Sequence, residues 1–312
     1  MKSKTDVRAA LTGPIPTIRT PYLENGEIDY RGLKNMIDFD IQVGGAKSIV
    51  LTVGDSHLIA MSDQEIADVT KATTEYVNGR ALVVAADRYY DTKQAVSFAK
   101  FAGGVGADVV MVLPPDWAAS GTPESFSEHY TAVGRHLPVM IVTGGFIPRG
   151  SAFALKTIEL TLERTENLVA IKDDMCGEFA RKLGLLAHER CAVWAGGLKQ
   201  NHLNMAPYGG VGYLSTFLTF KPEIAWRYWK AWAAGDLAGA VGVIRDYDMP
   251  LLDFISGLPG GFDAAMHGLL ELYGLAKRWR PNPYHSLTDA EMERLSDFLK
   301  SKLLLSKEET KK

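Results

Sequence analysis

The chain is poor in cysteine, in long apolar runs and in blocks of like charge. Its two cysteines, Cys176 and Cys191, among 312 residues are too few for a disulfide framework and are typical of a protein in a reducing cytoplasm. Its apolar runs, such as residues 107–115 with the lone Asp108, fall far short of the roughly 20 residues of a membrane span. The first ten residues contain charges and no apolar core, so we expect no secretion signal and no membrane partner.

The net charge and the missing motifs exclude further classes of function. A net charge of −3 without a basic block argues against nucleic acid as a partner. No cluster of His, Cys or Asp has the spacing of a zinc site. The glycine pairs Gly144-Gly145 and Gly209-Gly210 lack the GxGxxG and Walker patterns of phosphate-binding loops. We therefore expect a protein that handles a small molecule without a metal or an organic cofactor.

Eight short apolar runs follow one another at roughly even spacing along the first two thirds of the chain. Each is almost continuously apolar, which is typical of a strand buried on both faces of a parallel sheet. Hydrophobic residues make up 46% of the chain and charged residues 23%, enough apolar material for a large core. The predicted strands are residues 14–19, 47–53, 81–86, 108–113, 137–142, 168–172, 191–195 and 212–216.

The segments between these runs have helical periodicity and helix-start signals. Ser62 followed by Glu65, and Thr122 followed by Pro123, are typical helix N-termini. Thr288 with Glu291 three residues later predicts the start of the last helix. The helices predicted in full are residues 30–43, 222–235, 237–252, 263–277 and 288–305.

Strands that alternate with helices predict a parallel sheet, and eight such repeats close most naturally into a (β/α)₈ TIM barrel. No linker rich in Pro, Gly or Ser divides the chain. We therefore predict a barrel over residues 1–220, a C-terminal helical extension packed on it over 221–306, and a charged tail over 307–312.

Active sites of such barrels lie at the carboxyl ends of the strands. Lys172 directly follows the apolar tripeptide Val169-Ala170-Ile171, so we expect its side chain at the barrel mouth. Desolvation there disfavours the charged ammonium, and a neutral amine can attack a carbonyl carbon to form an imine. From the tripeptide alone, a strand-end lysine that only pairs with Asp173 or Asp174 is the favoured interpretation, and the motifs around it reverse that preference.

The order of several motifs resembles the dihydrodipicolinate synthase / N-acetylneuraminate lyase family of Schiff-base-forming lyases. The resemblance spans about residues 11–305 and implies that Lys172 is the imine-forming lysine, that no cofactor is needed, and that the protein is a homo-oligomer, commonly a tetramer. The motifs that carry it are Thr20-Pro21-Tyr22 with Gly26-Glu27-Ile28-Asp29, Ala170-Ile171-Lys172-Asp173, and Gly209-Gly210-Val211-Gly212 with Leu214-Ser215.

The chain departs from that family at its usual helper residues. Where the family has GTTGE, which holds the substrate carboxylate, this chain has Val53-Gly54-Asp55-Ser56-His57. Where the family has its proton-handling tyrosine, at the end of strand five, this chain has Val142 and Thr143. Asp55 should repel a substrate carboxylate by roughly 1 to 4 kcal/mol at 4 Å, unless an ion pair with Arg88 neutralises it.

Other polar residues at the strand ends are candidates for the missing functions. His57, Tyr89 and Tyr90 are able to transfer the proton, and imidazole is best matched to neutral pH. Arg88 and Arg19 are candidate carboxylate anchors, because a guanidinium binds a carboxylate bidentately. The predicted substrate contacts are Gly54, Asp55, Ser56, Arg88, Thr143, Gly197 and Ser215.

The prediction is therefore a cytoplasmic, imine-forming aldolase or dehydratase that acts on pyruvate or a 2-keto-3-deoxy sugar acid. Dihydrodipicolinate synthase proper is an alternative that overall similarity favours. A catalytically silent barrel that binds a metabolite or a protein partner is the alternative that the lost tyrosine favours.

Overall fold

The computed structural model of the chain describes residues 2–302 and 304. Within them, the chain divides into two compact units. The first, here called the barrel unit, comprises residues up to 17 together with 46–215, and the second unit comprises 18–45 with the residues from 216 onward. Residues 18–45 thus group with the C-terminal helices. The predicted tail at 307–312 lies outside the described residues.

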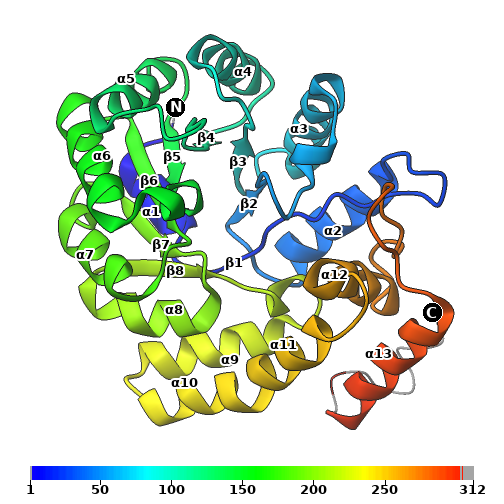
Figure 1. The fold of residues 1–312 in the computed structure, drawn as a ribbon. Coiled ribbons are helices and arrows are strands. Elements are labelled where there is room, and N and C mark those ends of the chain that lie inside the picture. The colour runs from blue at the N-terminus through cyan, green and yellow to red at the C-terminus, as the bar shows by residue number, and fades with distance from the viewer. Residues whose placement is uncertain (1, 303, 305–312) are drawn as a thin grey trace. The chain divides into compact units, whose positions relative to one another are not determined.

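The barrel unit contains one sheet of eight parallel strands, which confirms the predicted TIM barrel (Figure 1). The strands are hydrogen-bonded in the order β1-β8-β7-β6-β5-β4-β3-β2, and a parallel bridge from Thr17 to Val50 connects the first strand segment to the second. Every predicted apolar run overlaps one of them: β1 (Gly13–Ile15), β2 (Ser48–Val50), β3 (Leu82–Ala86), β4 (Val109–Val112), β5 (Val139–Val142), β6 (Leu168–Asp173), β7 (Ala192–Ala195) and β8 (Gly210–Leu214).

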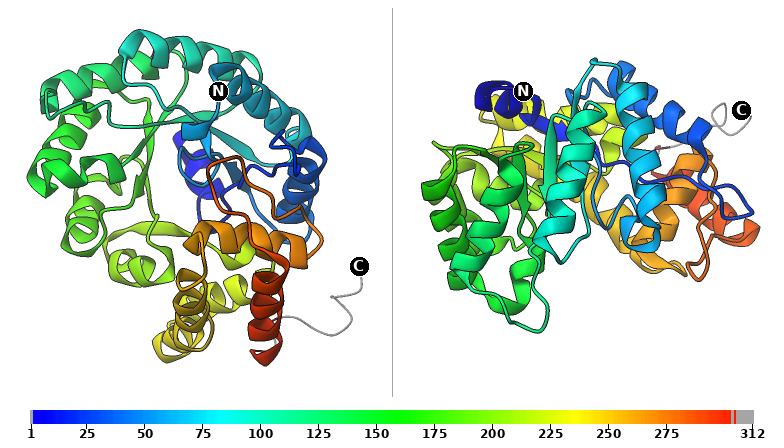
Figure 2. Two further views of the ribbon diagram at one scale, coloured as in Figure 1. Left: turned by 45° about the vertical axis from the view of Figure 1, so that its right-hand side comes forward. Right: turned by 90° about the horizontal axis from the view of Figure 1, so that it is seen from above.

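Helices alternate with these strands along the chain, and those of the barrel unit from residue 63 onward lie outside the strands (Figures 1 and 2). The predicted starts are confirmed at Ser62 and Thr122, whose hydroxyls accept the backbone N–H groups of Glu65 and Ser125 in capping boxes. The helices of this unit are α1 (Lys4–Ala10), α3 (Asp63–Val77), α4 (Thr92–Gly104), α5 (Pro123–Gly134), α6 (Ser151–Arg164), α7 (Gly177–Ala187) and α8 (Leu198–Met205).

The second unit is helical within the described residues. Its members are α2 (Tyr30–Gln42), α9 (Pro222–Ala233), α10 (Leu237–Val243), α11 (Met249–Ser256), α12 (Gly261–Leu272) and α13 (Asp289–Ser301). Met36 of α2 and Leu270 of α12 belong to one apolar cluster, and Trp226 of α9 donates from Nε1 to the carbonyl oxygen of Gly44 at 2.7 Å. Phe254 of α11 and Phe298 of α13 stack with ring centroids 4.1 Å apart.

Two helix predictions in this unit need correction. Residues 237–252 are not one helix, because a π-helical turn (Ile244–Asp248) separates α10 from α11, and Pro250, which lacks a backbone donor, sits in the first turn of α11. The helix predicted to reach Lys277 ends at Leu272, since Gly274 adopts a φ of +71°, which is typical of a helix C-terminus.

No helix of the described residues is both long enough and apolar enough to cross a membrane.

Candidate active site

Lys172 lies near the carboxyl end of β6, inside the barrel wall. Its strand register places it beside Val142 of β5 and Trp194 of β7, and the side chain Nζ lies 5.8 Å from the centre of the Trp194 ring. The residue is 7% exposed. Its ammonium forms an ion pair with Asp174, so burial of the charge is compensated by a carboxylate two residues away.

Lys172 lines a pocket of about 230 Å³, hereafter the lysine pocket. Its wall comes from the ends of β2 to β6, so five successive strands of the barrel unit enclose it. The lining residues are Thr52, Val53, Gly54, Asp55, Ala86, Asp87, Met111, Leu113, Val142, Lys172 and Asp174.

The junction between β5 and β6 is held by a buried hydrogen-bond network beneath this pocket. Thr143 Oγ1 donates to Asp173 Oδ1 at 3.2 Å and accepts from the Asp174 backbone N–H at 2.9 Å. Asn201 Nδ2 donates to Asp173 Oδ2 at 2.8 Å. Burial raises the pKa of Asp173, while the Asn201 bond opposes that rise. Thr143 is thus engaged by β6, whereas Val142 lines the lysine pocket.

The loop after β2 brings two of its predicted contacts to the pocket. Gly54 and Asp55 line it, and the Asp55 backbone N–H donates to Thr52 Oγ1 at 3.0 Å. Ser56 accepts the Thr52 backbone N–H at 3.0 Å and is fully buried. His57 is 5% exposed, with a left-handed φ of +57°. Neither Ser56 nor His57 is among the lining residues of the lysine pocket.

Three of the residues after β3 lie away from the lysine pocket. Arg88 forms a 2.9 Å ion pair with Asp63 at the start of α3, and the Tyr89 hydroxyl donates to the same carboxylate at 3.3 Å. Tyr89 lines a separate pocket with Phe98 and other residues of α3 and α4. Tyr90 is 57% exposed. The structure therefore places these three residues outside the lining of the lysine pocket.

Asp87, one residue earlier, does line the lysine pocket, and sequence reasoning did not select it as a site residue. It is 1% exposed and its Oδ1 accepts the backbone N–H of Leu113 at 3.3 Å. Burial raises the pKa of this carboxyl to about 8, and the Leu113 hydrogen bond only partly offsets the effect. The signal available in the sequence was an acidic residue directly after an apolar strand.

The remaining predicted contacts do not line the lysine pocket. Gly197 is the residue before α8, and a Cβ there would lie 2.5 Å from the sulfur of Cys176. Ser215 follows β8, is 2% exposed, and its backbone N–H donates to the Ile15 carbonyl at 2.9 Å. Both positions serve close packing or strand continuity within the barrel unit.

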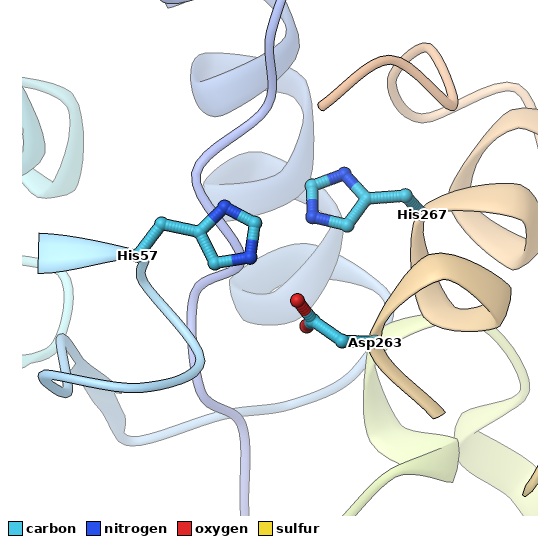
Figure 3. Close-up of side chains that lie close together, drawn as sticks. All are labelled: His57, Asp263 and His267. Carbon is cyan, nitrogen blue, oxygen red and sulfur yellow. The ribbon is translucent and has the colours of Figure 1, made fainter. Parts of the chain in front are cut away.

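Arg19, the other predicted carboxylate anchor, belongs to the second unit and pairs there with Asp263 at 2.8 Å. Arg280 pairs with the same carboxylate, so Asp263 joins two guanidinium groups. Asp263 and His267 lie one turn apart on α12, whereas His57 comes from the loop after β2 (Figure 3). The charge of Arg19 is thus balanced inside its own unit.

Chains related to this one support the same reading of the fold. A 4-hydroxy-tetrahydrodipicolinate synthase from Ruegeria pomeroyi is 28% identical over 89% of this chain and 94% of its own length. An uncharacterized DapA-like lyase from Rhizobium meliloti is 28% identical over 75% of this chain and 77% of its own length.

Solved structures share the architecture at lower identity. The dihydrodipicolinate synthase of Oceanobacillus iheyensis superimposes with a TM-score of 0.82 at 23% identity, covering 96% of this chain and 99% of that one. The N-acetylneuraminate lyase of Fusobacterium nucleatum gives 0.83 at 15% identity, covering 95% and 100%. YagE, an E. coli K12 prophage protein of the dihydrodipicolinic acid synthase family solved in complex with pyruvate, gives 0.78 at 20% identity, covering 94% and 99%.

The family model described as the dihydrodipicolinate synthetase family matches residues 10–302. With eight parallel strands around a pocket that contains the strand-six lysine, the chain belongs to the dihydrodipicolinate synthetase family and is a lyase of that family.

Proposed function

We propose that this lyase forms an imine between Lys172 and the C2 carbonyl of a small 2-oxo acid, either pyruvate or a 2-keto-3-deoxy sugar acid. Through this imine the enzyme cleaves or dehydrates the sugar acid. The observation that carries the proposal is a buried lysine that lines a pocket at the carboxyl ends of the strands. The pocket volume of about 230 Å³ lies below the roughly 300 Å³ at which pockets for drug-sized ligands begin, which suits a small acid. The pyruvate complex of the E. coli relative supports a 2-oxo acid.

Asp174 has a defined part in this scheme. Its ion pair with Lys172 supplies a carboxylate that can accept a proton from the ammonium and pass it to water. The resulting neutral Nζ attacks C2 of the oxo acid, and loss of water gives an iminium ion. The iminium withdraws electrons from C3 and so stabilises the enamine that forms when a proton or a C–C bond is lost there.

The charges in the lysine pocket favour a hydroxylated substrate. Asp55, Asp87 and Asp174 line it together with Lys172, so acceptors of hydrogen bonds outnumber cations there. Substrate hydroxyl groups can donate to Asp55 and Asp174, which would offset the repulsion between Asp55 and the substrate carboxylate. Since Arg88 pairs with Asp63 outside this lining, we do not assign it to the substrate carboxylate.

Borohydride trapping tests the proposal. Incubation with pyruvate or 2-keto-3-deoxygluconate and sodium borohydride should add the mass of the reduced adduct to one peptide, the one that contains Lys172. Intact mass followed by peptide mapping measures it. An adduct on any other lysine would contradict the assignment, and no adduct with a panel of 2-oxo acids would favour a silent barrel that binds a metabolite.

We also expect the chain to be a poor dihydrodipicolinate synthase. Asp55 lines the pocket where the resembling family has its GTTGE motif, and it should repel the carboxylate of pyruvate by roughly 1 to 4 kcal/mol at 4 Å. A coupled assay with pyruvate and aspartate semialdehyde should give a kcat/KM below roughly 10⁴ M⁻¹s⁻¹. A higher value would show that this reaction is the natural one.

The proposal includes a homotetramer in the cytoplasm, as the family resemblance and the two cysteines suggest. Size-exclusion chromatography with light scattering measures the first of these properties.

A further inference from the structure

We infer that Asp87 is the acid–base residue of the lysine pocket, where it donates a proton to the departing carbonyl oxygen of the substrate and then removes a proton from the imine. This inference rests on the proposed function and names the residue that does the work of the family's tyrosine in this chain.

The position of Asp87 is fixed by its backbone and by one carboxylate oxygen. Its backbone N–H donates to the Met111 carbonyl at 3.1 Å, which continues the pairing of β3 with β4. Its Oδ1 accepts from the Leu113 backbone N–H at 3.3 Å. Met111 and Leu113 line the same lysine pocket as Asp87 and Lys172, so the Asp87 carboxyl is hydrogen-bonded to the wall of that pocket.

The second oxygen, Oδ2, is buried and has no hydrogen-bond partner among the described residues. Burying a polar atom without a partner is unfavourable, and native proteins rarely keep one without a functional reason. A substrate in the adjoining pocket can supply the partner. Asp40 of α2 is also buried with both oxygens unpartnered, but it does not line the lysine pocket.

The protonation state fits the role. Burial raises the pKa of Asp87 to about 8, so near pH 7 most of the carboxyl carries its proton and can act first as an acid. The titratable groups that share its pocket or its electrostatic field are Lys172 and Asp174 of the β6 end, Asp55 of the loop after β2, Tyr89 of the loop after β3 and Tyr130 of α5. Burial first, and then the charge of Asp87, raise the pKa of Tyr130, so the phenol stays protonated.

The proton balance closes in two steps. When neutral Lys172 has added to C2, the hydroxyl of the carbinolamine takes the proton of Asp87 and leaves as water, with its C–O bond electrons, which yields the iminium and an Asp87 carboxylate. That carboxylate then removes a proton from C3, and the electrons of the C–H bond neutralise the iminium as an enamine. In C–C cleavage it instead removes the proton of the C4 hydroxyl, C4 becomes a carbonyl, and the electrons of the C3–C4 bond form the enamine. Asp87 ends in the acid form in which it began.

Other pocket residues are less suited to these steps. Val142 has no exchangeable proton, and Asp174, the ion-pair partner of Lys172, already has the part of accepting the proton of the ammonium. The hydroxyl of Thr143 is engaged with Asp173. Asp55 lines the pocket from a loop and is only partly buried, so it is less firmly held against the pocket wall than Asp87.

The inference is tested by the rate at which the C3 hydrogens of pyruvate are replaced by deuterium in D₂O, which NMR measures. Asp87→Asn should lower the exchange rate by about 10² to 10⁴-fold, while borohydride on long incubation still traps pyruvate on Lys172. Asp87→Glu should restore part of the rate.

In the unsubstituted protein the rate of adduct formation should decline as pH rises through about 8, and this decline should be absent in Asp87→Asn. Asp40→Asn, which also removes a buried carboxyl without partners, should leave exchange unchanged.

The outcomes separate this inference from the proposed function. An adduct on Lys172 with undiminished exchange in Asp87→Asn would overturn the role of Asp87 and leave the imine intact. Equal losses in Asp87→Asn and Asp40→Asn would assign the effect to packing and overturn it as well. Absence of any adduct in the unsubstituted protein would contradict the proposed function itself, and the inference would fall with it.

Discussion

Replacing Lys172 by alanine is expected to lower the kcat for cleavage or dehydration of a 2-keto-3-deoxy sugar acid by at least about 10⁴-fold. The side chain lost is the nucleophile, so the iminium electron sink cannot form and the remaining groups of the pocket act on an unactivated ketone. Asp174 would also lose its counter-ion, which adds repulsion toward an anionic substrate. Steady-state kinetics with 2-keto-3-deoxygluconate, together with mass analysis after borohydride, measure both effects.

Lys182→Ala is the matched control for this experiment. Lys182 forms an ion pair with Glu178 on the exposed surface of α7, so its removal takes away a lysine and an ion pair without touching the pocket. We expect its kcat to be unchanged. If Lys172→Ala kept a kcat within about tenfold of the unsubstituted protein, catalysis would not run through an imine on this residue.

The second large effect is on the pH dependence of stability. The pKa of Asp87 is raised to about 8 in the folded chain, against about 3.9 in an unfolded one. The folded state therefore holds this proton more tightly, and its stabilising contribution is complete below pH 4 and is lost as pH rises through about 8. A difference of about four pKa units corresponds to at most about 6 kcal/mol.

Asp87→Asn has no such proton, so its free energy of unfolding should fall less than that of the unsubstituted protein between pH 4 and pH 9. Urea titrations at several pH values measure the difference between the two proteins. This comparison cancels the contribution of Asp40, whose pKa burial also raises. A constant difference across that range would mean that Asp87 is solvated in the folded protein, contrary to its 1% exposure.

The sequence by itself determined the barrel and the position of Lys172 within it. A strand buried on both faces is apolar almost throughout. Each of the eight strands can therefore be recognised from its own residues, without knowledge of the strands beside it. Helix starts such as Ser62 are equally local, because the cap and its partner Glu65 are three residues apart. The position of Lys172 at the end of a buried run is local as well, but its selection depended on the order of the motifs along the chain.

Only the tertiary structure decided which residues join Lys172 in a pocket. Arg88 and Tyr89 are one and two residues from Asp87, yet they meet Asp63, about 25 residues earlier in the chain. Asp87 is instead covered by the end of β4, and its Oδ1 meets Leu113, 26 residues later. Burial by distant segments sets which carboxyl keeps its proton, and that desolvation, unlike helix or strand preference, leaves no periodic pattern in the sequence.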